Sequence, residues 1–182
     1  MDLILAVVAA ILMLPLALGL ALAVRLTSHG PALYWSDRIG ANERIFRMPK
    51  LRTMKVGTPA VATHLMTDPR SALTPIGGFL RRTSLDEIPQ LWSVVTGDMS
   101  FVGPRPALFN QADLIALRRA AGVTPLRPGI TGWAQINGRD ELPIPVKVGF
   151  DREYLERRSL LFDLRIIFAT AAKLLGDRTV TH

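Results

Sequence analysis

The densest group of chemically active side chains lies at residues 81–90, which read Arg-Arg-Thr-Ser-Leu-Asp-Glu-Ile-Pro-Gln. Ser84 and Glu87 have the spacing of a capping box, in which each side chain accepts a hydrogen bond from the other residue's main-chain amide. Pro89 is tolerated best close to a helix start, so the segment predicts a helix that begins near Ser84. This start explains Asp86 and Glu87 structurally, because acids in a first turn complement the helix dipole.

A catalytic interpretation uses the same geometry. Free amides at a helix N-terminus bind anions, and Arg81 and Arg82 precede this helix start by about one turn. A carboxylate there can hold Mg²⁺ or attack phosphorus, as aspartate does in enzymes that form an aspartyl phosphate. A cation and guanidinium groups would then offset the charge of a diphosphate while the carboxylate approaches in line. The residues alone leave the structural and the catalytic interpretation open.

A second candidate is the string Gly103-Pro104-Arg105-Pro106. Two prolines restrict the backbone on both sides of Arg105, and a guanidinium held in this way suits bidentate phosphate binding. A rigid turn with a solvated arginine explains the string equally well. Further basic candidates, each explained more simply as a surface charge, are Lys50, Arg52, Arg127 and Arg139.

The composition excludes several kinds of site. The chain has no cysteine, which excludes a disulfide scaffold, a cysteine zinc site, an iron–sulfur cluster and a thiol nucleophile. Its three histidines are far apart and lack the spacing of metal ligands. The sequence contains no glycine-rich dinucleotide fingerprint, no P-loop and no G-x-S-x-G elbow.

Charge and hydrophobicity are separated along the chain. Residues 3–24 carry no charge, while the rest is basic and gives the 182-residue chain a net charge of +7. A helix of that length can span a bilayer core of about 30 Å at about 1.5 Å per residue. Pro15 lies near the middle of the run, so we expect a kink or a break there. Membrane association is favoured over a buried helix, and the residues leave a full span and a re-entrant hairpin open.

The remaining pattern predicts a mainly α fold with small β elements. The last helix is apolar, and a stripe along it fits either the core or an amphipathic position at a membrane surface, with the core favoured. That stripe consists of Leu160, Leu164, Ile167, Ala171 and Leu174. The expected elements are short strands within 33–55, a loop over 56–75, and helices over 76–82, 84–95, 107–120 and 150–175.

These elements, in this order, resemble the catalytic core of the bacterial sugar transferases, the monotopic phosphoglycosyl transferases that act on polyprenol phosphates. The resemblance covers about residues 3–175, and its longest strings, S-L-D-E-x-P-Q and G-D-M-S-x-x-G-P-R-P, are specific. The matching pieces are the apolar segment with its proline, K-L-R-T-M at 50–54, D-P-R at 68–70, the strings within 80–91 and 97–106, R-P-G-I-T-G-W-A-Q-I-N-G-R at 127–139, and Asp151, Tyr154 and Asp163.

The resemblance implies a reaction and a site. Family members transfer a sugar-1-phosphate from a UDP-sugar to a polyprenol phosphate such as undecaprenyl phosphate, with release of UMP, in the first membrane step of glycan or exopolysaccharide assembly. A covalent phosphosugar forms on the first acid of an Asp-Glu dyad, here Asp86, with Glu87 as the second acid and Mg²⁺ beside both. The residues that match the phosphate-binding positions are Lys50, Arg52, Arg81, Arg105 and Arg139.

The resemblance also implies a topology. Pro15 would break a re-entrant helix over residues 1–27, so that both ends face the cytoplasm and a compact catalytic domain over 28–182 lies at the inner membrane. Expected partners are the UDP-sugar, the polyprenol phosphate and membrane lipids, without nucleic acid, and the oligomeric state stays open, a homodimer included. The stretch 142–146 departs from the family pattern, and the sequence does not name the sugar.

The alternative function is a membrane-tethered binding module, whose basic side chains bind lipid headgroups or nucleic acid without turnover. Nucleic acid is disfavoured because the aromatic residues are few and are not interleaved with the basic ones. Loss of turnover with retained membrane binding in an Asp86 variant would separate the two functions.

Overall fold

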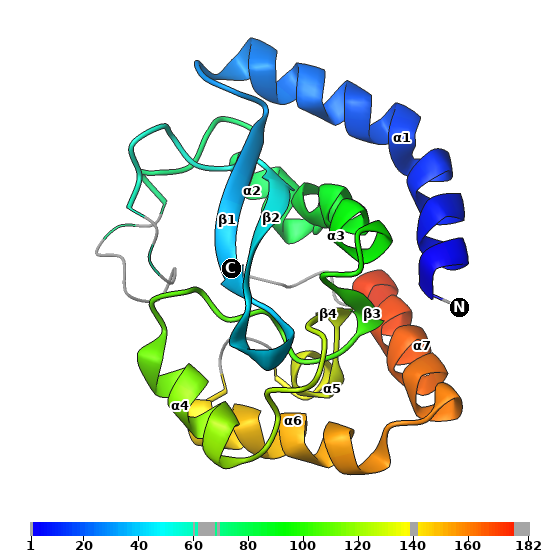
Figure 1. Ribbon diagram of the computed structural model, residues 1–182. Coiled ribbons are helices and arrows are strands. Elements are labelled where there is room, and N and C mark those ends of the chain that lie inside the picture. Colours follow the sequence, from blue (N-terminus) through cyan, green and yellow to red (C-terminus); the bar gives the residue numbers. More distant parts are fainter. Residues whose placement is uncertain (1, 60, 62–67, 69, 139–141, 177–182) are drawn as a thin grey trace. The chain divides into compact units, whose positions relative to one another are not determined.

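The computed structural model describes residues 2–59, 61, 68, 70–138 and 142–176 (Figure 1). Helices dominate and the two sheets are small, which confirms the predicted fold class. The described residues form two compact units, one within 2–36 and 47–95 and the other within 37–46 and 96–176. Each unit is described by itself below.

The first unit begins with the long apolar helix α1, Asp2–Thr27. Pro15 lies inside it without interrupting it, so the break expected of a re-entrant segment is absent. The axis of α1 nevertheless changes direction partway along (Figure 1). A proline removes one main-chain hydrogen bond and crowds the preceding turn, which bends a helix without requiring it to end. The bend agrees with the expected kink, and the re-entrant course of the helix stays a prediction.

Most side chains of α1 are exposed. Only Ala6 and Val24 are buried, whereas leucines, isoleucines and valines along its length face outwards. The helix is long and apolar enough to cross a membrane by length and composition. It packs on the short helices α3 and η3 of the same unit. An apolar surface of this size on a helix is typical of contact with lipid or protein.

The rest of the first unit is built around the end of a hairpin. Strand β1, Leu33–Ile39, pairs with β2, Ile45–Leu51, across the 3-10 turn η1, Ala41–Glu43, and residues 37–46 at the hairpin tip belong to the second unit. Then follow α2, Gly77–Arg82, the 3-10 helix η3, Leu85–Gln90, and α3, Leu91–Val95. Val24, Leu51 and Leu80 form the core of this unit.

The second unit places four helices around a short parallel sheet. Strand β3, Ser100–Val102, pairs in parallel with β4, Gly129–Thr131. The helices are α4, Ala112–Ala120, α5, Trp133–Ile136, α6, Ile144–Arg157, and α7, Leu160–Gly176. A cluster that includes Val102, Leu126, Tyr154, Phe162 and Ile166 forms its main core.

Two helices of this unit differ in detail from the sequence prediction. Helix α6 begins at Ile144, six residues earlier than expected, because a proline in the first turn suits a helix start. On α7 the core explanation is right and the stripe is right in part: Ile167 packs against the core and Leu164 is half-buried, whereas Leu160 is exposed and the fully buried residues are Phe162 and Ile166. The membrane-surface position of that exposed face stays a prediction.

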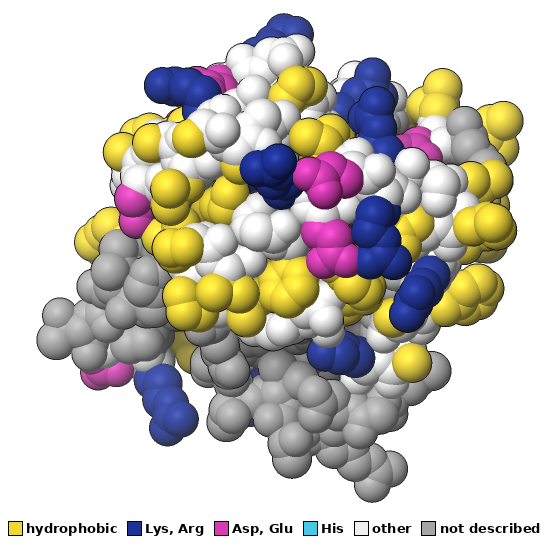
Figure 2. All heavy atoms as spheres, turned by 90° about the horizontal axis from the view of Figure 1, so that it is seen from below, with side chains coloured by type: hydrophobic (Ala, Val, Ile, Leu, Met, Phe, Trp, Pro, Cys, Tyr) yellow, Lys and Arg dark blue, Asp and Glu magenta, His cyan; other side chains and the backbone are white. Residues whose placement is uncertain are grey.

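The exposed surface of α6 carries ion pairs one turn apart, Arg152 with Glu156 and Glu153 with Arg157. On the face seen in Figure 2, acidic and basic side chains likewise lie beside one another among apolar ones. This face therefore carries a mixture of charges and no patch of a single sign.

Candidate functional site

The acidic segment is built differently from its predicted capping box. Ser84 adopts the left-handed conformation, with φ 56° and ψ 17°, and its side chain caps no amide. A capping residue needs an extended backbone, so the left-handed conformation of Ser84 rules out the box. The main-chain amide of Glu87 instead donates to the carbonyl of Ser84 at 3.1 Å, as in a 3-10 turn.

The predicted anion site at a helix N-terminus is also absent. The expected helix over 84–95 consists of the six-residue 3-10 helix η3 and the five-residue helix α3. Neither is long enough to align many peptide dipoles, so charged side chains must provide the electrostatics of this segment.

Asp86 is buried beside a guanidinium. Only 7% of the residue is exposed. Burial lowers the pKa of Arg81, on α2, and the negative charge of Asp86 opposes that shift. Arg81 donates its Nε hydrogen to Oγ1 of Thr53 at 3.0 Å, which fixes the orientation of its planar group. The structure therefore brings together the predicted nucleophile and one predicted phosphate-binding arginine.

Glu87 is held by a different cation. Nζ of Lys50, near the end of β2, donates to Oε1 of Glu87 at 2.7 Å, and the two side chains are 15% and 17% exposed. The sequence predicts Lys50 as a phosphate ligand, whereas the structure pairs it with the second acid of the dyad. A charge-assisted bond in this partly buried place orients the Glu87 carboxylate.

Arg52 contacts the segment that follows the apolar helix α1. Its Nε donates to the carbonyl of Pro31 at 2.6 Å, and its Nη2 donates to the carbonyl and hydroxyl oxygens of Ser28 at 3.1 and 2.9 Å. The residue is only 5% exposed. These contacts tie the segment after α1 to the end of β2 and leave Arg52 apart from the acids.

Residues 50–53 therefore form one strip with three attachments. Lys50 contacts Glu87, Arg52 contacts the exit of α1, and Thr53 contacts Arg81. Gly77 at the start of α2 makes this packing possible, because a Cβ there would lie 2.1 Å from the carbonyl oxygen of Thr53. The sequence analysis did not identify Thr53 as a partner of Arg81. Nothing in the string K-L-R-T-M distinguishes this threonine.

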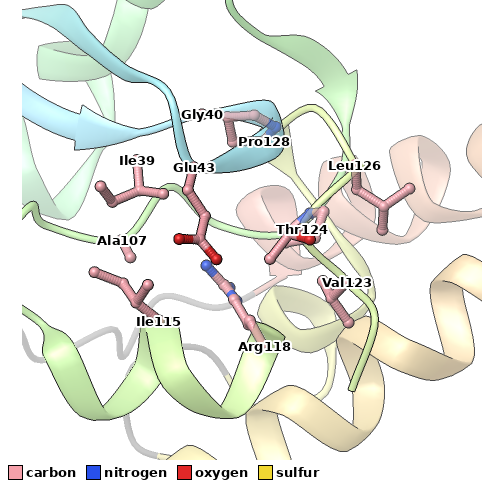
Figure 3. A pocket seen from close by; sticks show the side chains of 11 residues that line it. Ile39, Gly40, Glu43, Ala107, Ile115, Arg118, Val123, Thr124, Leu126 and Pro128 are labelled. Carbon is pink, nitrogen blue, oxygen red and sulfur yellow. The ribbon is translucent and has the colours of Figure 1, made fainter. Parts of the chain in front are cut away.

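The remaining predicted residues lie elsewhere. Arg105 belongs to the second unit, where it is half-buried, and Pro15 lies within α1. Arg139 lies outside the described residues. A small pocket of the second unit, lined by Pro104 and Ala107 beside Arg105, also holds Glu43 and Arg118, whose charged ends point toward one another in Figure 3.

The described side chains of this site offer few ligands for a hard divalent cation such as Mg²⁺. Within the part of the chain that the structure describes, no three acidic or histidine side chains cluster as metal ligands. Mg²⁺ is commonly held by one or two carboxylates together with substrate phosphates, so Asp86 and Glu87 suffice in number. Lys50 bonds one oxygen of Glu87, so a cation at this place would share the Glu87 carboxylate with Lys50.

Comparison with known proteins agrees with this chemistry. The sequence pattern of the family described as "bacterial sugar transferase" matches residues 1–177. A "UDP-glucose:undecaprenyl-phosphate glucose-1-phosphate transferase" of Xanthomonas campestris pv. campestris is 40% identical over 98% of this chain and 38% of its own length. A protein of the same name from Escherichia coli K12 is 40% identical over 94% of this chain and 39% of its own length.

A third relative is of similar size. The "exopolysaccharide production protein ExoY" of Sinorhizobium fredii is 36% identical over 93% of this chain and 81% of its own length. The chain thus spans less than two fifths of the Xanthomonas and Escherichia proteins and about four fifths of this one. Because the family pattern covers nearly the whole sequence, the chain belongs to the bacterial sugar transferase family.

Proposed function

We propose that the chain transfers a sugar-1-phosphate from a UDP-sugar to a polyprenol phosphate such as undecaprenyl phosphate, with release of UMP. The observation that carries the proposal is the buried Asp86 beside Arg81, next to a Glu87 that Lys50 holds in place, in a chain with the family pattern. Relatives named as UDP-sugar:undecaprenyl-phosphate transferases support the choice of donor and acceptor. The step would belong to glycan or exopolysaccharide assembly, and the sugar itself stays open.

The proposed reaction has two displacements. An oxygen of the Asp86 carboxylate attacks the phosphorus that bears the sugar, a new O–P bond forms, and the bond to the bridging oxygen of the diphosphate breaks, so that UMP leaves. A phosphate oxygen of the polyprenol phosphate then attacks the same phosphorus, and the Asp86 carboxylate leaves. No proton or electron is gained or lost overall, and one nucleophile serves two bulky substrates in turn.

The neighbouring side chains divide the other tasks. Arg81 neutralises phosphate charge beside the nucleophile, and Lys50 keeps Glu87 oriented. Asp86 and Glu87 are the residues that would hold Mg²⁺, which supplies charge neutralisation on the diphosphate when bound. We propose Arg105 and Arg139, from the family resemblance alone, as further phosphate ligands. Arg52 has the same basis, although its contacts place it at the exit of α1.

The location of the reaction follows from α1. Its exposed apolar surface would insert into the inner membrane, and the basic remainder of the chain would attract anionic lipid, polyprenol phosphate and UDP-sugar on the cytoplasmic side. We propose a re-entrant course in which the bend of α1 returns the helix to the same face. The family resemblance and the proline at position 15 support this course.

Topology is tested by cysteine labelling. The chain has no native cysteine, so single cysteines at position 2 and position 28 can be labelled in sealed membrane vesicles with an impermeant thiol reagent. A re-entrant helix makes both positions react from the cytoplasmic side. Reaction from opposite sides would replace this topology with a full span.

The nucleophile is tested with Asp86→Asn. The amide keeps the shape of the carboxylate but is a far weaker nucleophile, so UMP release from UDP-sugars should fall to background while membrane association is retained. Mass spectrometry of the native chain, incubated with donor alone, should find the phosphosugar on residue 86. Asp113→Asn, at an exposed acid on α4, is the matched control and should leave turnover unchanged.

Normal turnover by Asp86→Asn, or an adduct on another residue, would contradict the assignment. Membrane binding without turnover by the native chain, over a panel of UDP-sugars with a polyprenol phosphate acceptor and Mg²⁺, would favour the binding-module function instead.

A further inference from the structure

The corner that carries Arg105 is held through its main chain. Residues 103–107 belong to no helix and to no strand, yet four successive carbonyl groups each accept a hydrogen bond from a different place in the second unit. The four bonds are Gly129 N to Pro104 O at 3.0 Å, Arg118 Nη1 to Arg105 O at 2.9 Å, Arg38 Nη1 to Pro106 O at 3.0 Å, and Ile39 N to Ala107 O at 3.0 Å.

Burial singles out one side chain on this corner. Residues 102–104 and 106–108 are buried, whereas Arg105 between them is half-buried. Two prolines already restrict the backbone dihedrals beside it. The main chain of this corner is thus held by hydrogen bonds and by the two prolines. Within 102–108, Arg105 is the one residue that is not fully buried.

Two of the four donors are arginine side chains, and the donor to Arg105 itself is anchored. Arg118, on α4, forms an ion pair with Asp151, on α6, in which Nε and Nη2 lie 2.9 and 2.7 Å from Oδ2. The two side chains are 12% and 2% exposed. Burial raises the pKa of the Asp151 carboxyl, and the charge and hydrogen bond of Arg118 oppose this shift.

A buried ion pair contributes little net stability, because desolvation offsets most of the attraction. Its value lies in geometry, since a planar guanidinium that is bound on two edges has almost no freedom to turn. Nε of Arg118 donates to Oδ2 of Asp151, Nη2 lies within ion-pair distance of the same oxygen without a hydrogen bond, and Nη1 donates to the carbonyl of Arg105. Arg118 also lines the adjoining, mostly apolar pocket, where its charged end and that of Glu43 point toward one another (Figure 3).

We infer that Arg118, anchored by Asp151, is a positioning residue that sets the Arg105 guanidinium for a phosphate of the donor. The inference rests on the proposed function, in which Arg105 binds phosphate. Arg118 itself touches no substrate and acts through the main chain of Arg105. Displacement of a binding group by about 1 Å can cost on the order of a hundredfold in rate, so loss of this contact should be visible in kinetics.

The test is a double-mutant cycle on UMP release, with Arg118→Met and Arg105→Ala. Arg118→Met should lower kcat/KM for the UDP-sugar by about tenfold or more, chiefly through KM. In the Arg105→Ala background the same change should alter kcat/KM less than twofold. Equal losses in both backgrounds would show that Arg118 acts independently of Arg105 and would overturn the inference.

A second variant separates positioning from folding. Arg118→Lys can keep one ionic contact with Asp151 but cannot also bond the Arg105 carbonyl in a fork, so thermal stability should recover while kcat/KM stays low. Full recovery of kcat/KM by lysine would refute the inference, and this variant carries the test if Arg118→Met does not fold. Arg152→Met, at the exposed pair with Glu156 on α6 of the same unit, is the control and should change kcat/KM less than twofold.

The inference and the proposed function fail in different ways. If the native chain releases UMP and Asp86→Asn abolishes this release, the proposed function stands. If the effects of Arg118→Met and Arg105→Ala on kcat/KM are then additive, only the positioning role of Arg118 is refuted. Arg105→Ala with native kcat/KM removes both the phosphate role of Arg105 and the inference, and leaves the Asp86 reaction standing.

Discussion

The acidic segment at 84–90 and the proline corner at 103–107 both carry proposed chemistry on backbone outside long helices and strands, but they are fixed by different kinds of contact. In the acidic segment, side chains hold side chains: Lys50 bonds Glu87, and Arg81 lies beside Asp86. In the corner, four successive main-chain carbonyl groups each accept a hydrogen bond.

This difference matches what each region is asked to do. A nucleophile that bonds phosphorus and is released again must exchange electrostatic partners during each cycle, and side-chain contacts can be exchanged without moving the backbone. A binding arginine has only to be in place when the substrate arrives, and a backbone bonded at four successive carbonyls achieves this in advance. Each region should therefore fail in its own way when its contacts are removed.

The largest effect is expected in the corner, from Gly103→Ala. A Cβ at this position would lie 2.3 Å from the carbonyl oxygen of Arg127 and 2.9 Å from the amide of Gly129, so the main chain itself must move. We expect the free energy of unfolding to fall by about 3 kcal/mol or more, measured by thermal or denaturant unfolding in detergent.

The matched control is Gly149→Ala on α6 of the same unit. A Cβ there would meet nothing within 4 Å, and alanine is the better helix former by about 1 kcal/mol, so this variant should gain stability slightly. Equal behaviour of the two variants would show that the corner is not held as tightly as its bonds imply.

The next effect concerns the acidic segment, through Lys50→Met. Removal of the ammonium leaves the Glu87 carboxylate partly buried without this partner, which should lower the unfolding free energy by about 1–3 kcal/mol. Because Glu87 loses its orientation, kcat for UMP release should also fall by about tenfold or more. Lys55→Met removes an exposed lysine whose Nζ donates to the carbonyl of Ser71, and should leave both quantities nearly unchanged. Native kcat in Lys50→Met would contradict the side-chain support of the dyad.

A smaller effect is expected at Ser84, where the acidic segment begins. Its left-handed backbone suits glycine, so Ser84→Gly should stabilise the chain by about 0.5–1 kcal/mol and Ser84→Val should destabilise it by about 1–2 kcal/mol. Differential scanning calorimetry would measure both changes. If glycine destabilises and lowers kcat together, the serine side chain has a chemical role that its backbone conformation does not explain.

The sequence predicts the parts of these regions that depend on local pattern. The strands within 33–55, the helix ending at Arg82 and the existence of the last helix follow from turn residues and apolar spacing. The left-handed Ser84 replaces the predicted capping box, and the helix expected from 107 begins at Ala112 because residues before it complete the corner. These outcomes are set by packing between distant segments, which spacing along the chain does not encode.

The candidate site shows the same limit. Asp86, Glu87 and Arg81 are recognisable because they stand in one string, and the structure places them together. The partners that fix them come from afar: Lys50 is 37 residues from Glu87, and Thr53 is 28 residues from Arg81. Arg118 gave no signal at all, because an arginine near the end of a helix is explained by the helix dipole alone.

The smallest effect is expected at Glu153, on the surface of helix α6 in the second unit. Its carboxylate accepts a hydrogen bond from Nε1 of Trp133 at 2.7 Å and pairs with Arg157; together they hold the pKa of Glu153 below its usual 4.5. A carboxyl whose pKa is lower in the folded than in the unfolded state stabilises the fold when the pH is above the unfolded-state pKa. This stabilisation is lost as the pH falls through the folded-state pKa. Glu153→Gln keeps an acceptor for Trp133 but does not titrate, so the native chain should be slightly more stable than the variant at pH 7. That difference should vanish as the pH falls from 5 to 3, measured by thermal unfolding of both proteins in parallel. A difference that does not change with pH would mean that the bond from Trp133, and not the charge of Glu153, supports this edge, and that the second unit is held by main-chain and neutral contacts even at its surface.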